Sequence, residues 1–170
     1  TKTKNLKIEN AQEGIGIVNG GLDIYNCIFK SLSSAISTAS STNQDTFYIK
    51  KNLILNNKYR GNGINHIGGG IHFIFNNIIL GLDPSARYGI DLFSDKYSEV
   101  KNNLIANYLL YNYNGGVFSE KAIIENNVFI QKNVSHTNND NIVVLKGEGT
   151  TIRNNIIASA KHYGIRSQND

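Results

Sequence analysis

The chain has no methionine and only one cysteine, Cys27, among its 170 residues. A single cysteine excludes a disulfide within the chain. The absence of methionine leads us to expect a processed or excised piece of a larger protein. No apolar run approaches the length of a membrane-spanning helix. With 40% hydrophobic and 18% charged residues, the composition is not that of a disordered chain. We therefore expect a single folded domain over residues 1–170.

Positive charge is in slight excess, and it is spread along the chain instead of forming one block. Seventeen Lys and Arg against 13 Asp and Glu give a net charge of +4, with a pI near 9.1. A nucleic-acid groove requires a denser basic stripe with aromatic residues between the charges. We therefore expect no nucleic-acid partner and no membrane insertion. An acidic polysaccharide fits the mild excess better, and a solvated basic surface is the simpler alternative.

One six-residue pattern recurs through the chain at a nearly constant interval. Its clearest copy is Ile124-Glu125-Asn126-Asn127-Val128-Phe129, in which an aliphatic anchor precedes an asparagine pair and two apolar residues. The anchor falls at positions 24, 49, 74, 100, 124 and 152, so the steps are 25, 25, 26, 24 and 28 residues. A period in this range is typical of a solenoid. Each unit divides into three short β segments without helical periodicity.

The asparagine pair has a physical role at the corner between two strands. A two-residue corner forces one residue toward left-handed backbone angles, which Asn tolerates better than most residues. When coils stack, the asparagine side chains lie above one another and can hydrogen-bond as a ladder. The predicted ladder contains Asn52, Asn77, Asn103, Asn127 and Asn155.

Three other features follow from the same register. Cys27 occupies the ladder position one coil earlier, so we interpret it as a small buried residue and not as a reactive thiol. His72 lies two residues before the anchor Ile74, so strand alternation places it inside the solenoid. Residues 38–45 and 131–140 are polar and are predicted to form longer loops.

The repeated hydrophobic-x-Asn-Asn-hydrophobic-hydrophobic corner resembles that of the pectin-lyase-like superfamily. Short Gly-Ile-x strands, such as Gly63-Ile64-Asn65 and Gly89-Ile90-Asp91, belong to the same resemblance, which covers nearly the whole chain. It implies an all-β, right-handed parallel β-helix of about seven coils with an Asn ladder. The superfamily includes pectate and alginate lyases, polygalacturonases, mannuronan epimerases, phage tailspikes and adhesins. The fold therefore does not fix the function.

The resemblance also implies a location for the site, on the outer face of the first sheet and its flanking loops. Aromatic rings there would cover sugar rings, and Arg or Lys would pair with uronate carboxylates. The outward column is predicted as Ser37, Asn65, Asp91, Phe118, Val144 and Arg166. Flanking candidates are Lys58, Tyr59, Arg60, Arg87, Tyr88, Tyr113, His162 and Tyr163. Within this set, Arg60, Asn65, Arg166, His162 and Tyr163 are the predicted substrate-binding residues.

The nearest match to a catalytic motif is Tyr88-Gly89-Ile90-Asp91. It is similar to the Tyr-Gly-hydrophobic-Asp that begins the active-site motif of mannuronan epimerases. That family continues with Pro-His-Asp, whereas this chain continues with Leu92-Phe93-Ser94. The predicted catalytic residues are Asp91, Tyr88 and Arg87. For a lyase or an epimerase, the base would be Tyr88, His162 or Lys58, and Arg87 or Arg60 would neutralise the substrate carboxylate.

For hydrolysis, Asp91 would have to act with Asp83 or Asp95 across the glycosidic bond. No acidic triplet suggests a calcium site, so no cofactor is expected, with calcium kept as an alternative that has no clear site.

Three functions remain open at this point. The chain is an enzyme acting on an extracellular, acidic polysaccharide, as a lyase, an epimerase or a hydrolase. Alternatively, it is a non-catalytic glycan-binding module of a phage tailspike or adhesin, or it is a structural rod. The partner is a polysaccharide in the first two cases. We expect a monomer for an enzyme and a trimer, with Phe118 at the interface, for a spike. The expected location is secreted, cell-surface or phage-borne.

Overall fold

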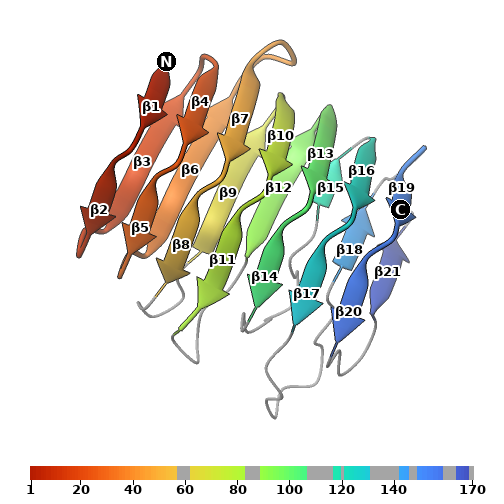
Figure 1. Cartoon of the computed structure of the whole chain (residues 1–170). Helices are drawn as coiled ribbons and strands as arrows, with labels where there is room; N and C mark the ends of the chain where they lie inside the picture. The colour runs from red at the N-terminus through yellow and green to blue at the C-terminus, as the bar shows by residue number, and fades with distance from the viewer. Residues whose placement is uncertain are drawn as a thin grey trace.

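The computed structural model describes residues 1–56, 62–82, 89–106, 117–119, 121–130, 142–145, 149–158 and 164–168. For residues 56, 93–95, 117–119, 142–145 and 166–168 it describes the backbone alone. Within these ranges the chain forms strands joined by turns (Figure 1). No helix in the described part of the chain is long and apolar enough to cross a membrane.

The strands assemble into three sheets of seven strands each. Sheet A contains β1 (Lys2–Lys4), β4 (Leu22–Tyr25), β7 (Thr46–Lys50), β10 (Ile71–Phe75), β13 (Tyr97–Lys101), β16 (Ala122–Glu125) and β19 (Thr151–Arg153). Sheet B contains β2 (Lys7–Glu9), β5 (Ile28–Lys30), β8 (Leu53–Asn56), β11 (Ile78–Gly81), β14 (Leu104–Ala106), β17 (Val128–Ile130) and β20 (Ile156–Ala158). Sheet C contains β3 (Glu13–Val18), β6 (Ser34–Ser40), β9 (Asn62–Gly68), β12 (Ile90–Asp95), β15 (Val117–Ser119), β18 (Ile142–Leu145) and β21 (Ile165–Gln168).

Each strand pairs in parallel with the equivalent strand of the neighbouring coil. The anchor Ile49, for example, lies opposite Ile24 on one side and Ile74 on the other. The strands of sheets A and B run down the front of the molecule, and those of sheet C run up behind them, as the chain advances from left to right (Figure 1). The chain is therefore a right-handed parallel β-solenoid, and the predicted fold class is confirmed.

The core consists of aliphatic and aromatic columns that point inward from the three sheets. In sheet A the anchors Ile24, Ile49, Ile74, Val100 and Ile124 are at most 1% exposed. Phe29, Ile54, Ile79, Ile105 and Phe129 form the equivalent column of sheet B. Burial of these columns supplies the main favourable free energy of folding. It also explains the aliphatic anchor of each repeat.

The predicted asparagine ladder is present at the corner between sheets A and B. Asn77 donates from its backbone N–H and from Nδ2 to Oδ1 of Asn103, at 2.9 and 3.0 Å. Its own Oδ1 accepts the same pair of bonds from Asn52, both at 3.0 Å. Nδ2 of Asn77 also donates to the carbonyl oxygen of Ile49 at 2.9 Å. The pattern continues through Asn127 to Asn155. Each side chain therefore satisfies polar groups in the coils on both sides.

Cys27 closes the ladder at its N-terminal side. It is 1% exposed, and its backbone N–H donates to Oδ1 of Asn52 at 2.9 Å. The thiol is buried, as the sequence predicted.

One residue at each corner between sheets A and B adopts the left-handed conformation. These residues have φ between 54° and 58° and are Asn5, Asn26, Lys51, Asn76, Asn102, Asn126 and Asn154. At the corners with an asparagine pair, the two asparagines therefore have different roles. The first makes the turn and is exposed, and the second is buried in the ladder.

Two histidines lie in the core near the corner between sheets C and A. His66 and His72 are both 0% exposed, and their ring centroids are 4.3 Å apart. Nε2 of His66 lies 3.0 Å from the carbonyl oxygens of Gly68 and Gly69. Nε2 must therefore carry the proton, and Nδ1 accepts from the Thr38 hydroxyl at 2.7 Å. His72 stacks on Phe47 with centroids 4.5 Å apart. Burial lowers the pKa of His72 to about 3, so its ring is neutral at ordinary pH.

The structure corrects two expectations about sheet C. Strand β6 runs to Ser40, so the first part of the predicted loop over residues 38–45 is strand. Thr38 is buried there and hydrogen-bonds to His66. Because its side chain is polar, the sequence pattern did not indicate that it points inward.

The C-terminal register of sheet C also differs from the expectation. Val144 lies opposite Val117, not Phe118, and Arg166 lies opposite Val143. The segments before these short strands differ in length from coil to coil. Alignment of the strands by the Gly-aliphatic pattern therefore predicted the wrong register between neighbouring strands.

Removal of one ladder side chain should destabilise the solenoid strongly. In Asn77→Ala the two bonds from Asn52 to Oδ1 and the bond to the Ile49 carbonyl are lost in a buried site. We expect a loss of about 2–4 kcal/mol, since each buried polar group left unsatisfied costs about 1–3 kcal/mol. Urea unfolding followed by circular dichroism measures this loss. The control is Asn76→Gly, which keeps the exposed left-handed corner and should change stability by about 1 kcal/mol or less. Equal losses in both variants would contradict the structural role of the ladder.

The buried His72 should make the solenoid sensitive to acid. Its folded-state pKa lies below 6.5, the usual pKa of histidine. As the pH falls below 6.5, the unfolded chain therefore takes up a proton that the folded chain excludes. We expect this group to reduce stability by about 2 kcal/mol between pH 7.5 and pH 5. His72→Phe, which keeps the stack on Phe47, should remove that part of the pH dependence. Identical pH profiles of unfolding for both proteins would rule out the buried neutral histidine.

Candidate functional site

Three residues of the predicted outward column lie among the described residues of sheet C. Ser37, Asn65 and Asp91 lie in register on neighbouring strands β6, β9 and β12. All three are partly exposed on the outer face, whereas their neighbours Ile64 and Ile90 point into the core. The structure thus forms the first half of the predicted outward column.

The other predicted residues of that site lie outside the description. Arg166 is described by its backbone alone. Tyr88, Arg87, Arg60, His162 and Tyr163 fall outside the described ranges, as do Lys58, Tyr59 and Tyr113. The catalytic and substrate-binding roles given to them remain predictions.

One irregularity in the backbone lies beside Asp91. Between β12 and β15, Leu92 lies opposite Val117, while Asp95 lies opposite Ser119. Over this stretch β12 therefore has one residue more than β15, and an extra residue of this kind is a β-bulge. Bulges re-aim side chains and are enriched next to active sites. The strand next to Asp91 is therefore irregular, and the sequence repeat does not predict this irregularity.

No metal site forms within the described ranges. No three His, Cys, Asp or Glu side chains of those residues lie close enough together to hold an ion. The described carboxylates of sheet A are instead paired with basic side chains.

A second surface, on the outer face of sheet A, was not predicted from the sequence. The outward positions of neighbouring strands form two columns of side chains. One column contains Lys2, Asp23, Tyr48, Phe73, Glu99, Ile123 and Thr151. The other contains Lys4, Tyr25, Lys50, Phe75, Lys101, Glu125 and Arg153. Aromatic and basic residues gather in the N-terminal part of both columns.

The aromatic side chains of this face pack against one another along the solenoid axis. Tyr48 and Phe73 stack with ring centroids 4.9 Å apart and an interplanar angle of 11°. Phe73 also contacts Phe75 and the edge of Tyr97, with centroids 6.0 and 6.3 Å away. The faces of these rings are therefore largely directed at neighbouring rings. Tyr25 and Tyr48 remain 39% and 38% exposed, respectively.

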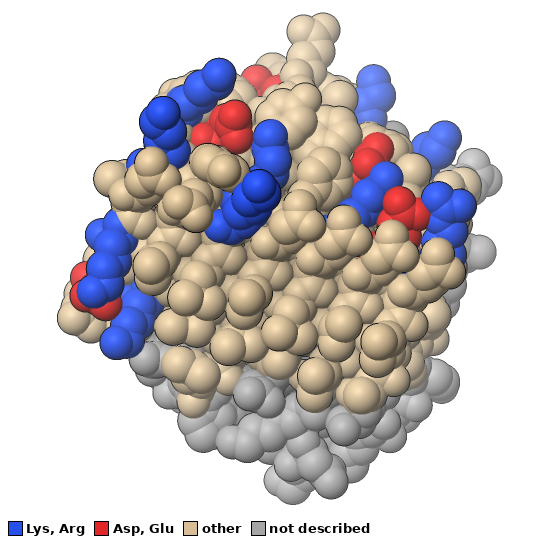
Figure 2. Space-filling model, in the orientation of Figure 1, with Lys and Arg blue, Asp and Glu red and all other residues tan. Residues whose placement is uncertain are grey.

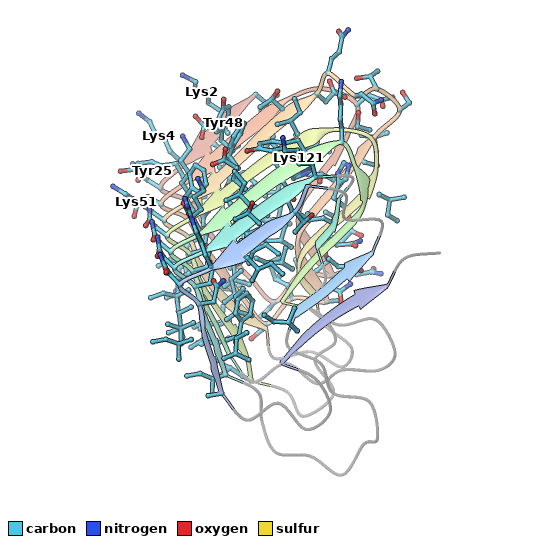
Figure 3. All side chains as sticks on the ribbon, turned by 90° about the vertical axis from the view of Figure 1, so that its right-hand side faces the viewer. Lys2, Lys4, Tyr25, Tyr48, Lys51 and Lys121 are labelled. Atoms are coloured by element: carbon cyan, nitrogen blue, oxygen red, sulfur yellow. The ribbon has the colours of Figure 1, made fainter. Side chains whose placement is uncertain are left out.

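Lysines surround these rings. Lys50 Nζ lies 4.6 Å from the centroid of Tyr48, and Lys51 Nζ lies 5.5 Å from that of Tyr25. Lys2, Lys4 and Lys51 project from the same outer face as Tyr25 and Tyr48 (Figure 3). We define the basic aromatic face as Lys2, Lys4, Tyr25, Tyr48, Lys50, Lys51, Phe73 and Phe75.

The basic aromatic face contains four lysines, and the only carboxylate in the same rows of β1, β4 and β7 is that of Asp23. Asp23 contacts Lys50 at 3.9 Å. Among the described residues, Lys2, Lys4 and Lys51 have no ion-pair partner. Figure 2 shows Lys and Arg gathered over the upper left of the molecule, where β1, β4 and β7 lie. The N-terminal coils of sheet A therefore present a surface of positive charge.

The C-terminal part of the same face is electrically balanced. Lys101 contacts Glu99 at 2.7 Å and Glu125 at 3.1 Å, and Arg153 also pairs with Glu125. Hydrogen bonds from Arg153 and Lys101 lower the pKa of Glu125. Burial, together with the 2.7 Å bond from its hydroxyl to Glu99, raises the pKa of Tyr97 to about 12. These groups neutralise one another, so they do not extend the positive surface.

The outer face of sheet B is different in character, because it is apolar. From β5 onward its outward column contains Ile28, Leu53, Ile78, Leu104, Val128 and Ile156. The same column begins with the charged Lys7 on β2. Ile28, Ile78 and Ile156 are 38%, 43% and 62% exposed. This face is the uncharged expanse below the basic residues in Figure 2.

A sequence signal for the basic aromatic face did exist. Tyr48 and Phe73 each directly precede an anchor, and Tyr25 and Phe75 each directly follow one. These positions alternate with the buried anchors, so they face outward. The repeat that predicted the core could therefore have located this surface.

In comparisons with known proteins, no protein-family model, no curated protein and no solved structure matches the chain. The chemistry of the site is therefore argued from its own residues.

The stacked pair should be energetically coupled. We expect a double-mutant cycle of Tyr48→Ala and Phe73→Ala to give a coupling free energy of about 1 kcal/mol, the usual range for aromatic pairs. Urea unfolding of the four proteins supplies the values. The control cycle uses Tyr25→Ala and Phe75→Ala, whose strands are separated by β7, and should show no coupling. A cycle without coupling at Tyr48 and Phe73 would mean that the stack does not form.

Proposed function

We propose that the chain is a β-solenoid module that binds an acidic polysaccharide along the outer face of sheet A. The observation that carries this proposal is the basic aromatic face. Four lysines and the exposed Tyr25 and Tyr48 share one side of the N-terminal coils, with a single carboxylate among them. Lysine ammonium groups pair with carboxylates of uronate sugars, and tyrosine hydroxyls bond to sugar hydroxyls.

The geometry of the face favours an extended polymer over a small molecule. Small ligands bind in concave pockets that bury most of their surface. This surface is instead a broad array of side-chain rows that spans several coils (Figure 2). Successive rows are about 4.8 Å apart, as in any parallel sheet. A polymer with regularly repeated charges can contact several rows at once.

The orientation of the rings argues against single-stranded nucleic acid. Such ligands stack their bases on exposed aromatic faces. Here Tyr48 and Phe73 stack on each other, and Lys50 lies over Tyr48. At this stack, ring edges and the Tyr48 hydroxyl are what remain for a ligand. Hydroxyl-rich sugars can use these groups without intercalation.

Three further statements belong to this proposal. The parallel solenoid with its asparagine ladder supports membership of the pectin-lyase-like superfamily. A polysaccharide ligand places the chain outside the cell, as part of a secreted protein, a cell-surface adhesin or a phage particle. The apolar outer face of sheet B favours the oligomeric, spike-like form of the module over a monomeric enzyme, because a second copy would shield it.

A second candidate function is catalysis on sheet C. The bulge between Leu92 and Asp95 lies beside Asp91, the one predicted catalytic residue whose side chain is described. A lyase, an epimerase or a hydrolase would use this region, with the acidic polymer as substrate. In this case the basic aromatic face would be a substrate-binding surface next to the site.

The test is a panel of polygalacturonate, alginate, hyaluronate, neutral dextran and duplex DNA, with binding and product release followed together. We expect the acidic polysaccharides to bind, more weakly at high salt, and dextran not to bind. The double variant Lys2→Gln/Lys4→Gln should weaken binding about fivefold, since two exposed ion pairs together contribute about 1 kcal/mol. Lys30→Gln removes one exposed lysine of sheet B, serves as the control for location, and should bind as the unchanged protein does.

The other outcomes separate the alternatives. Loss of affinity in the Lys30 control equal to that in the double variant would refute the location on sheet A. DNA binding as tight as polysaccharide binding would refute glycan recognition. Release of unsaturated or reducing ends that is abolished in Asp91→Ala would establish the catalytic candidate. Full turnover in Asp91→Ala would remove Asp91 from the mechanism.

A further inference from the structure

Lys51 occupies a corner position where every other coil has asparagine. The residues in this column are Asn5, Asn26, Lys51, Asn76, Asn102, Asn126 and Asn154. Lys51 has φ 55°, within the 54–58° range of the other six. Its backbone N–H donates to the carbonyl oxygen of Phe75 at 3.0 Å, as that of Asn76 does to Lys101 at 3.1 Å. The backbone is therefore the same, and only the side chain differs.

Lysine is a poor choice for this backbone conformation. The left-handed region is disfavoured for residues with a Cβ, and Asn is tolerated because its short polar side chain bonds locally. Lysine has no such compensation. The column also shows an amide–amide contact, in which Nδ2 of Asn26 donates to Oδ1 of Asn5 at 2.8 Å, and lysine has no side-chain acceptor with which to continue such a chain of contacts. The fold alone would therefore favour asparagine at position 51.

The contacts of Lys51 do not explain its presence through stability. Its side chain is exposed, and among the described residues it has no ion-pair partner. Within the described part of the chain, its Nζ lies 5.5 Å from the centroid of the Tyr25 ring. That distance is near the limit of about 6 Å for a cation–π contact, and such contacts are weak when exposed. A strained residue without structural benefit points to function.

The surroundings of Lys51 suggest what it recognises. It projects from the molecule beside Tyr25 and Lys4, on the side where Tyr48 also lies (Figure 3). Lys4 lies opposite Tyr25 in the sheet. A tyrosine flanked by two lysines offers two cations, an apolar ring and a hydroxyl within a small area. This combination suits a pyranose ring that carries a carboxylate.

We propose that Lys51 and Tyr25 form the point at which the solenoid recognises the carboxylate of an acidic sugar. This inference rests on the proposed function, since it names the specificity-determining contact of that surface. Lys51 pairs with the carboxylate, and Tyr25 supports the sugar ring. The strained backbone at position 51 is kept because asparagine there would lose the charge.

The test compares Lys51→Asn with the unchanged chain in two measurements. Lys51→Asn gives the corner the residue of the other six coils, so the melting temperature should rise by about 2–4 °C. Affinity for polygalacturonate, measured by calorimetry, should fall about five- to tenfold. Affinity for carboxyl-reduced polygalacturonate, which is neutral, should not change. Lys51→Arg should retain most of the affinity, because it keeps the charge.

The matched control moves the charge to another corner. The double variant Lys51→Asn/Asn102→Lys keeps the net charge and places a lysine next to the coil of Phe75, at a corner with φ 57°. We expect its affinity to stay as low as that of Lys51→Asn. Recovery of affinity in this variant would overturn the inference, because net charge alone would then suffice.

The inference and the proposed function fail in different ways. If the unchanged chain binds no acidic polysaccharide, the proposed function fails. If the chain binds and Lys51→Asn binds equally well, the function stands and the role of Lys51 is refuted. If Lys51→Asn is no more stable than the unchanged chain, the strain argument is refuted. Lys51→Gly, which also relieves the left-handed corner, provides a second variant for both measurements.

Discussion

The asparagine ladder at the corner between sheets A and B is the constraint on which the rest of the solenoid depends. Each ladder side chain bonds to the coil before it and the coil after it, so Asn52, Asn77, Asn103 and Asn127 are 1–2% exposed and still satisfied. A buried amide without those partners would be costly. Coils can therefore stack in only one register, and this register places anchor above anchor through the core.

A fixed register turns every outward position into a row across the sheet. A functional surface can then be built by single substitutions at one position of successive coils, without any change to the core. Sheet A shows this principle clearly. Its N-terminal rows carry lysines and tyrosines, whereas its C-terminal rows carry Glu99, Lys101, Glu125 and Arg153, which pair with one another. The backbone is the same in both halves, and only the outward side chains distinguish a charged surface from a neutral one.

The outward rows also separate roles among the three sheets. Sheet A is basic and aromatic, sheet B is aliphatic, and sheet C carries Ser37, Asn65 and Asp91 beside a bulge. Lys51 is the position at which the demands of fold and surface conflict, because its backbone favours asparagine and its surroundings favour a cation.

The sequence by itself determined the solenoid, the ladder and the burial of Cys27 and His72. These features repeat every 24 to 28 residues, and a repeat carries its own register. The sequence also named Asp91 and Asn65 on one face, but it did not reveal the bulge beside them or the offset of Val144 and Arg166. Strand pairing settles those offsets across segments of unequal length. Only the tertiary structure decided that Tyr25, Tyr48 and the lysines share one surface, because residues from different coils become neighbours only when the coils stack.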